Sequence, residues 1–194
     1  MRKTMMIGLA EIPLMLVAFV SFSSNLRAQR SGSNIPWACS NFAPEEAAKN
    51  DPEEEQEYSR SLNEFYRLWC TSAERSPKTR EDAANTMTER WKKLWYRDDP
   101  FNAAFHETGS TDLLAMMAIT GKVPKPLLAD PAFMHDWLKD CSERCFMIYS
   151  EDESGEDRRR SLRLRNEALD HLKGKPAAKP VLDMLRTAKL EPVN

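Results

Sequence analysis

Glycine is scarce in this sequence, with six residues among 194, and no two of them lie close together. A loop that cradles a phosphate needs closely spaced glycines, because the backbone itself must approach the phosphate oxygens. The Gly-x-Ser-x-Gly turn that presents a nucleophilic serine is also absent. The sequence therefore contains no motif for nucleotide binding and none for a serine hydrolase of that type.

An excess of basic charge is missing as well. The chain holds 28 Lys and Arg against 30 Asp and Glu, and without residues 1–28 the balance becomes 25 against 29. Nucleic-acid-binding domains usually carry a clustered basic surplus, so we expect no nucleic-acid partner. With 41% apolar and 30% charged residues, the composition is that of an ordinary globular domain and not of a disordered chain.

Alternating β-branched residues, the pattern of strands, occur nowhere in a convincing run, whereas apolar residues recur at helical spacing. Helix starts are indicated by an acid or serine before proline, and stops by isolated glycines. The sequence predicts an all-α fold, a single compact bundle of six or seven helices over residues 51–194, preceded by an irregular segment over residues 29–50. The predicted starts are Asp51-Pro52, Ser76-Pro77, Asp99-Pro100, Asp130-Pro131 and a last one near Pro180.

Two further expectations concern a helix end near Gly109 and the burial of two cysteines. The helix that starts at Asp99-Pro100 is predicted to close near Gly109, and a separate helix is predicted from Leu113 to Ile119, ended by Gly121. The helix that starts at Asp130-Pro131 carries Cys141 and Cys145 on its apolar stripe, so both cysteines are predicted to be buried.

The first 28 residues have the order of a secretory signal peptide. Arg2 and Lys3 precede the apolar run from Ile12 to Phe22, and Ala28 supplies the small residue before a cut. A membrane span needs about 20 apolar residues, roughly twice the length of this run. We expect cleavage after Ala28, a periplasmic or secreted protein, and no stable membrane insertion after cleavage. The alternative is an uncleaved anchor that would carry Glu11 into the bilayer.

Four cysteines remain after that cut: Cys39, Cys70, Cys141 and Cys145. An even number in an exported chain predicts two disulfides. Residues four apart in a helix have Cβ atoms about 5–6 Å apart, and a disulfide needs about 3.5–4.5 Å. We therefore expect no bridge between Cys141 and Cys145, and expect each to pair with Cys39 or Cys70. Two distant cysteines and one close pair do not make a zinc site, so no metal is expected.

The pair His135-Asp136 resembles the His-Asp pair of secreted phospholipases A2, which are helical and disulfide-bonded. The resemblance implies a histidine base and a calcium-ligating aspartate. The chain lacks the glycine-rich calcium loop of these enzymes and the cysteine that precedes their histidine. With Met134 and Leu138 facing the core, Asp136 projects to the opposite side, which favours a surface pair.

Glu107 is a second candidate for chemistry. It is predicted to lie at a helix end, where lysozyme-like enzymes place their catalytic acid, and Asp112 follows it. The residues after Glu107 do not continue the pattern of lytic transglycosylases, and no second histidine completes a zinc-protease motif with His106. A structural residue at the end of a helix is the simpler interpretation.

An acidic run lies at the start of the first predicted long helix. Residues 45–57 contain seven acids and one base, and Glu53, Glu54 and Glu55 occupy the first helical turn. Negative charge is favoured there by the helix dipole. If the run also serves a function, these three exposed glutamates would attract a basic protein partner and accelerate its association.

A basic run follows at residues 158–165, with five arginines among eight residues. We interpret it as a solvated face balanced by the preceding acids, with Glu156 and Arg160 as an i,i+4 pair. Binding to anionic lipid or glycan is the alternative. Trp37, two residues before Cys39, is predicted either to pack beneath a disulfide or to anchor a partner.

Export, modest size, an acidic run and the absence of an assembled catalytic set lead to one interpretation. We expect an exported protein-binding domain that needs no cofactor and no metal, with a periplasmic immunity protein or inhibitor of a toxin or wall hydrolase as the most concrete form. The alternative is a secreted hydrolase, either phospholipase A2-like or cell-wall-cleaving.

Overall fold

The computed structural model describes residues 35–42, 49, 51–71, 76–97, 102–146 and 155–190, and of residues 102–108 the backbone alone. The predicted signal peptide lies outside these residues. Within them the chain forms eight α-helices and no strand, which confirms the all-α fold class. Six of the helices have nine or more residues, and the other two, α1 and α5, are single turns of four.

The helices follow the proline-marked starts closely. The elements are α1 (Ala38–Asn41), α2 (Glu53–Cys70), α3 (Pro77–Trp95), α4 (Asn102–Thr120), α5 (Lys125–Leu128), α6 (Pro131–Arg144), α7 (Glu156–Leu172), a 3-10 turn at Pro176–Ala178 and α8 (Lys179–Thr187). Ser76 and Asp130 cap α3 and α6, because their side-chain oxygens accept the backbone N–H groups of Thr79 and Phe133. Local sequence therefore sets these two helix starts.

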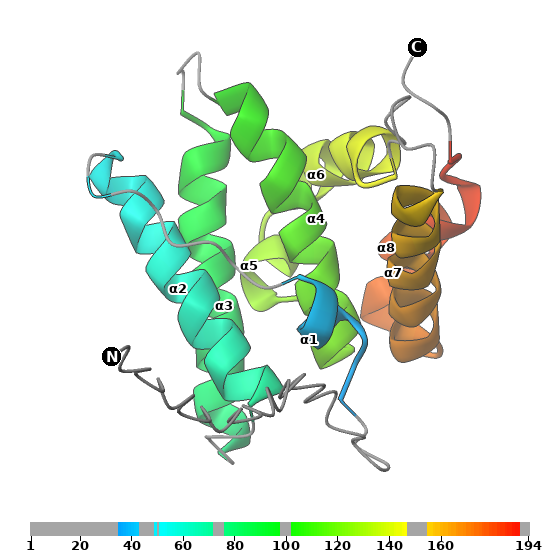
Figure 1. Ribbon diagram of the computed structural model, residues 1–194, viewed down its shortest axis with the longest axis horizontal. Helices are drawn as coiled ribbons and strands as arrows, with labels where there is room; N and C mark the ends of the chain where they lie inside the picture. The colour runs from blue at the N-terminus through cyan, green and yellow to red at the C-terminus, as the bar shows by residue number, and fades with distance from the viewer. Residues whose placement is uncertain are drawn as a thin grey trace, which may run out of the picture. The chain divides into compact units, whose positions relative to one another are not determined.

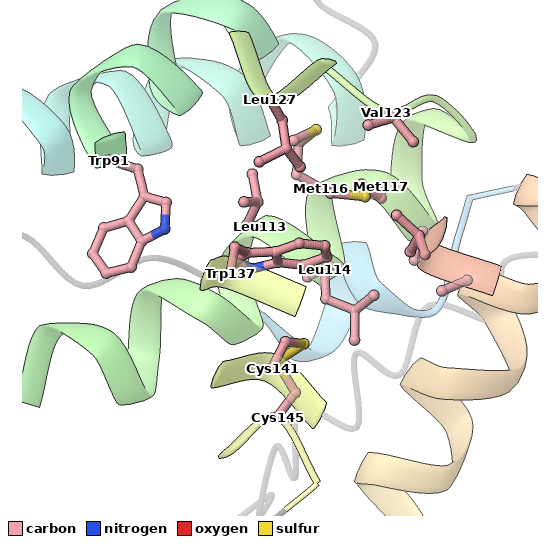
Figure 2. Close-up of a cluster of buried hydrophobic side chains, with 14 of the residues drawn as sticks. Trp91, Leu113, Leu114, Met116, Met117, Val123, Leu127, Trp137, Cys141 and Cys145 are labelled. Carbon is pink, nitrogen blue, oxygen red and sulfur yellow. A yellow bond between two sulfur atoms is a disulfide. The ribbon is translucent and has the colours of Figure 1, made fainter. Parts of the chain in front are cut away.

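Helix α4 lies at the centre of the bundle. Figure 1 shows α2 and α3 on one side of it and α7 and α8 on the other, with α5 and α6 behind. Every residue from Leu113 to Ile119 is buried, so this stretch of α4 is covered on all sides. In Figure 2 its leucines and methionines lie between Trp91 of α3, Trp137 of α6 and Leu127 of α5.

The predicted break at Gly109 is wrong, because α4 runs through this residue without interruption. An ideal Cβ atom placed on Gly109 would lie 2.4 Å from ring carbons of Trp91, which is closer than non-bonded carbon atoms can approach. The absence of a side chain therefore gives the indole room against the α4 backbone. The true end is Gly121, where φ is 61° and the N–H bonds to the carbonyl of Met117.

The two disulfides join Cys39 to Cys70 and Cys141 to Cys145, with no free cysteine. The expectation that Cys141 and Cys145 do not pair, and that each reaches Cys39 or Cys70, is therefore wrong. Four residues of a regular helix rise about 6 Å along its axis, whereas the two Cα atoms lie 4.7 Å apart. Helix α6 ends at Arg144, so Cys145 belongs to a tightened final turn and not to a regular helix.

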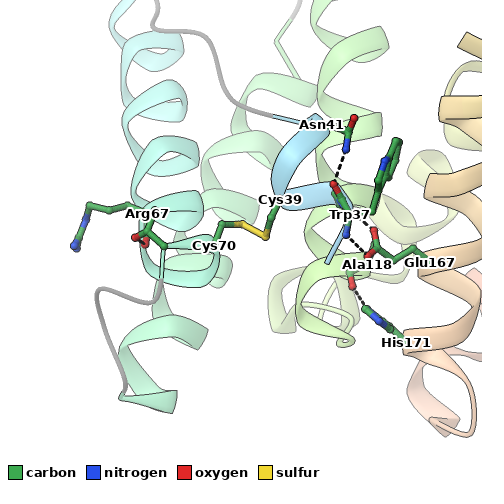
Figure 3. Close-up of a disulfide and its surroundings, with 10 residues drawn as sticks. Trp37, Cys39, Asn41, Arg67, Cys70, Ala118, Glu167 and His171 are labelled. Atoms are coloured by element: carbon green, nitrogen blue, oxygen red, sulfur yellow. Dashed lines mark hydrogen bonds between the residues drawn. A yellow bond between two sulfur atoms is a disulfide. The ribbon is translucent and has the colours of Figure 1, made fainter. Parts of the chain in front are cut away.

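Helix α1 lies within the segment that we expected to be irregular. Its first two free N–H groups, from Trp37 and Ala38, donate to the two carboxylate oxygens of Glu167 at 2.6 and 2.8 Å. Figure 3 shows this contact with α7 on one side and the Cys39–Cys70 disulfide to the end of α2 on the other. One helical turn thus connects two long helices that are far apart in the sequence.

Two further polar contacts join the C-terminal end of α4 to α7 and to the residues that follow α7. The ring Nδ1 of His171 contacts the carbonyl oxygen of Ala118, and the Lys175 ammonium donates to the carbonyl oxygen of Gly121. The last carbonyls of a helix have no partner within the helix, so these side chains satisfy groups that would otherwise need water.

Candidate functional site

The acidic run is only partly exposed. Glu53 and Glu54 are exposed at the start of α2, as expected, but Glu55 is buried, with 8% of its surface exposed. The expectation that all three glutamates are exposed is therefore wrong for Glu55. Its position in the helix explains this, because Glu55 is followed at helical spacing by Tyr58 and Leu62, both of which face the core.

Arginines from the neighbouring helix partly neutralise these acids. Arg97, just beyond α3, places Nη1 3.6 Å from Glu54 and 4.0 Å from Glu55, and Arg90 pairs with Glu57. The charge that this end of α2 presents is therefore smaller than seven acids suggest. Glu53 and Glu54 remain its outermost described carboxylates.

Of the two sequence candidates for catalysis, the structure describes the side chains of the pair His135-Asp136 alone. His135 and Asp136 are both exposed on α6, as the helix phase predicted, and neither lines a described hollow. Glu107 lies within α4 and not at a helix end, and its side chain is outside the described residues. Among the described residues, no three His, Cys, Asp or Glu side chains are grouped as a metal site would require.

The basic run has a structural role that the sequence did not reveal. Arg160 donates to the carbonyl oxygen of Asn41 and stacks over the ring of Phe42, with its guanidinium carbon 4.8 Å from the ring centre. Arg163 lies 6.0 Å from the ring centre of Trp37 in the same way. These arginines hold the segment around α1 through cation–π contacts, so they are not only a solvated face.

Trp37 is half-buried and packs against the core, and its ring also meets Phe42 edge to face at 5.7 Å. Trp37 therefore packs within the segment around α1, and its role as the anchor of a partner stays a prediction.

A partly buried carboxyl group lies between α2 and α4. Burial raises the pKa of Asp112 to about 6, and the hydrogen bond from the Tyr58 hydroxyl at 3.1 Å acts in the opposite direction. Burial and the nearby Asp112 also raise the pKa of Tyr58. The pair links α2 to α4, and this link depends on pH.

The largest of three hollows on the described part of the chain lies between α3 and α5. It has a volume of about 620 Å³, and charges of both signs line it, among them Asp82, Glu89, Arg90 and Lys93. A second hollow of about 290 Å³, between α2 and α3, is lined by Glu57, Arg60, Glu64 and others. Thr86 and Arg90 line both hollows, which therefore form one continuous face along α3.

This face was not anticipated from the sequence. Its residues belong to three separate elements, and each looks like an ordinary polar position on a helix surface. The periodicity of α3 does reveal its solvent side, since Asp82, Thr86, Glu89 and Lys93 recur at spacings of three and four. The periodicity does not show which neighbouring helices lie beside the solvent side of α3.

The two disulfides indicate an oxidising compartment, since paired cysteines persist outside the reducing cytosol. No helix in the described part of the chain is long and apolar enough to cross a membrane. No protein-family model, curated protein sequence or solved structure matches the chain.

Proposed function

We propose that this protein is an exported domain that works by binding another protein, and most specifically that it is a periplasmic immunity protein or inhibitor that neutralises a toxin or a wall hydrolase. The observation that carries the proposal is the continuous face along α3, in which two hollows on either side of the helix share Thr86 and Arg90.

The chemistry of this face suits a protein partner. Its lining is dominated by charged and polar side chains, which is typical of the rim of a protein interface and not of a pocket for a small apolar ligand. Arg90 lies where the two hollows meet, held by Glu57. Arginine is enriched among residues that dominate binding energy, and this one is already oriented before a partner arrives.

The acidic start of α2 adds steering at one end of the face. Arg97 follows the C-terminal end of α3 and lies 3.6 Å from Glu54, and Arg90 of α3 pairs with Glu57. The exposed Glu53 and Glu54 therefore lie near the C-terminal end of α3. A basic partner approaching this end would associate faster, and salt would reduce the gain because the Debye length is about 10 Å at 0.1 M.

A photo-crosslinking amino acid at Thr86 tests the binding face directly. In periplasmic extract of the source organism, we expect one dominant crosslinked protein from position 86 and none from position 166. Asn166 is equally exposed, but it lies on α7, on the other side of α4. Equal products from both positions, or none from position 86, would remove the support for this face.

The inhibitor function needs a second measurement. The crosslinked protein is purified, and its toxic or wall-cleaving activity is measured with and without the domain. Stoichiometric loss of that activity is expected. A captured partner whose activity is unchanged would leave a binding protein but refute the immunity function.

Reversing Glu53 and Glu54 to Lys tests the steering. The same change of charge at the exposed Asp136 and Glu143 of α6 is the control. We expect slower association for the α2 variant only, with the difference disappearing at high salt. If both double variants associate at the wild-type rate, the α2 acids are a solvated helix start with no part in binding.

A further inference from the structure

A third hollow, of about 290 Å³, differs from the face just described because its lining is mainly apolar. We call it the Trp69 groove. Its apolar surface comes from Trp69 of α2, Ala84 of α3, Met116 of α4, Leu128 of α5 and Ala178 of the 3-10 turn. Leu128 is one of two large hydrophobic residues that are exposed in the described part of the chain. Five elements thus converge on an apolar hollow that is open to solvent.

The rim of the Trp69 groove is positively charged. Lys122, Lys125 and Lys175 line it, and Glu81 is the one acidic residue in the lining, which leaves a surplus of two positive charges. The Glu81 carboxylate is paired with the Lys122 ammonium, and the pair is joined electrostatically by Lys125. A carboxylate of the protein itself is therefore already bound by a lysine in the lining of the groove.

We propose that the Trp69 groove binds an aliphatic chain that ends in an anionic group, of the kind found in a fatty acid. The apolar lining takes the chain, and the lysine rim takes the head group in the same way that it holds Glu81. This groove adjoins the protein-binding face, because Asn85 and Lys125 line both. The proposal does not depend on the function proposed for that face.

The size and chemistry of the groove favour such a ligand over a protein segment. A helix is about 10–12 Å across, and the groove is too small to hold one. Small-molecule sites begin near 300 Å³, which is about the volume of the groove. An extended peptide would need partners for its backbone, and the groove is walled mainly by helices, whose own backbone groups are already paired. An acyl chain requires no such partners.

Titration of the disulfide-bonded protein with decanoate tests the proposal by calorimetry and by tryptophan fluorescence. Trp69 is held by a hydrogen bond of 2.8 Å from its Nε1 to the carbonyl oxygen of Arg80, so a bound chain should change the emission of a fixed indole. We expect saturable binding of one decanoate, and a fluorescence change that is lost in Trp69→Phe. Octanoate should bind about 15-fold more weakly, since each buried methylene contributes about fourfold.

Charge variants test the rim. Lys125→Met should weaken decanoate binding about threefold, whereas Lys139→Met, an equally exposed position on α6, should not. Glu81→Gln should strengthen it, because the competing carboxylate is removed. Decyltrimethylammonium, which has the same chain with a cationic head, should bind at least tenfold more weakly than decanoate.

Steric variants test the location. Ala177 and Leu128 both line the groove at exposed positions, so Ala177→Trp fills it and Leu128→Glu adds a repelling charge without changing the core. Each should reduce decanoate affinity at least tenfold with little change in melting temperature. The proposal is overturned if decanoate shows no saturable binding at millimolar concentration, or if it binds these two folded variants as tightly as wild type. A leucine-rich acidic peptide that binds the groove more tightly than decanoate would overturn it as well, since the groove would then belong to a protein segment.

Discussion

The two sides of helix α4 are packed in different ways. On the side of α2 and α3, large rings carry the contact, with Tyr58, Trp91 and Trp95 in a chain whose neighbouring ring centres lie 5.6 and 5.8 Å apart. On the other side, the buried residues that α7 and α8 contribute are leucine, alanine, valine and methionine. Figure 1 shows the two sides flanking the central helix.

The difference explains where polar links occur. Small side chains such as Ala168 let α7 approach α4 closely, so His171 and Lys175 can reach backbone carbonyls at the end of α4. Aromatic rings keep helices apart, and on that side Gly109 is needed to accommodate Trp91. The ring-packed side thus depends on a precise fit, and the aliphatic side depends on close backbone approach supported by polar contacts.

The largest effect is expected where the two sides are tied together. Cys39 joins α1, which is held by Glu167 of α7, to Cys70 of α2 across 31 residues. In the chain-entropy model, replacing both cysteines by serine should lower the free energy of unfolding by about 4 kcal/mol, and the same change at Cys141 and Cys145 by about 2 kcal/mol.

Thermal unfolding of the two double variants measures that contrast, and non-reducing peptide mapping checks the pairing. Melting temperatures should fall by about 8–16 °C for the first variant and about half as much for the second. Peptides that link Cys39 or Cys70 to the end of α6 would contradict the pairing and the role assigned to α1.

The ring-packed side is expected to respond to pH through Asp112. Its pKa of about 6 lies above the value of about 3.9 for an unfolded aspartate, so the unfolded state ionises first as the pH rises. Stability should therefore fall as the pH rises from about 4 to about 6, by up to about 3 kcal/mol, and should then stay level.

Asp112→Asn keeps an acceptor for the Tyr58 hydroxyl and removes the ionisation. Denaturant unfolding between pH 4 and pH 7 should show a smaller loss of stability in this variant than in wild type, and a more stable protein at pH 7. Parallel pH profiles for the two proteins would show that Asp112 ionises with an ordinary pKa.

The fit around Gly109 should be sensitive to one added methyl group. Gly109→Ala places a Cβ atom 2.4 Å from Trp91, so the ring or the helix must move, at a cost of about 1–3 kcal/mol. Gly174→Ala is the control, because its Cβ meets nothing within 4 Å and only the left-handed backbone, with φ of 75°, opposes it. A Gly109→Ala variant as stable as wild type would mean that the ring-packed side adapts easily.

The smallest effect is expected at the carboxylate that caps α1. Glu167→Gln keeps one acceptor oxygen but loses the second and the charge, so the free energy of unfolding should fall by about 1 kcal/mol. In the Cys39→Ser, Cys70→Ser background the same change should cost less, because α1 is then already loosened from α2. A double-mutant cycle measures this coupling, and strict additivity would show that the disulfide and the carboxylate act independently.

Some features could be predicted because they depend on neighbours in the sequence. Asp130 and Ser76 cap helices through residues three positions away, and the apolar stripe of α6 faces Met134 and Cys141 inward, as its spacing indicated. The exposure of His135 and Asp136 followed from the same periodicity. These inferences succeed because a helix repeats every 3.6 residues wherever it occurs.

The sequence and the tertiary structure decided different features of this protein. The sequence by itself determined the all-α class, the capped starts of α3 and α6, and the formation of two disulfides. Only the tertiary structure decided that Gly109 makes room for Trp91 and does not end a helix, and that Glu55 turns inward towards Arg97. It also decided that Cys39 pairs with Cys70, and that five elements form the Trp69 groove. Helix propensity and capping act over a few residues, whereas partner choice and surface hollows depend on the packing of helices that are distant in the sequence.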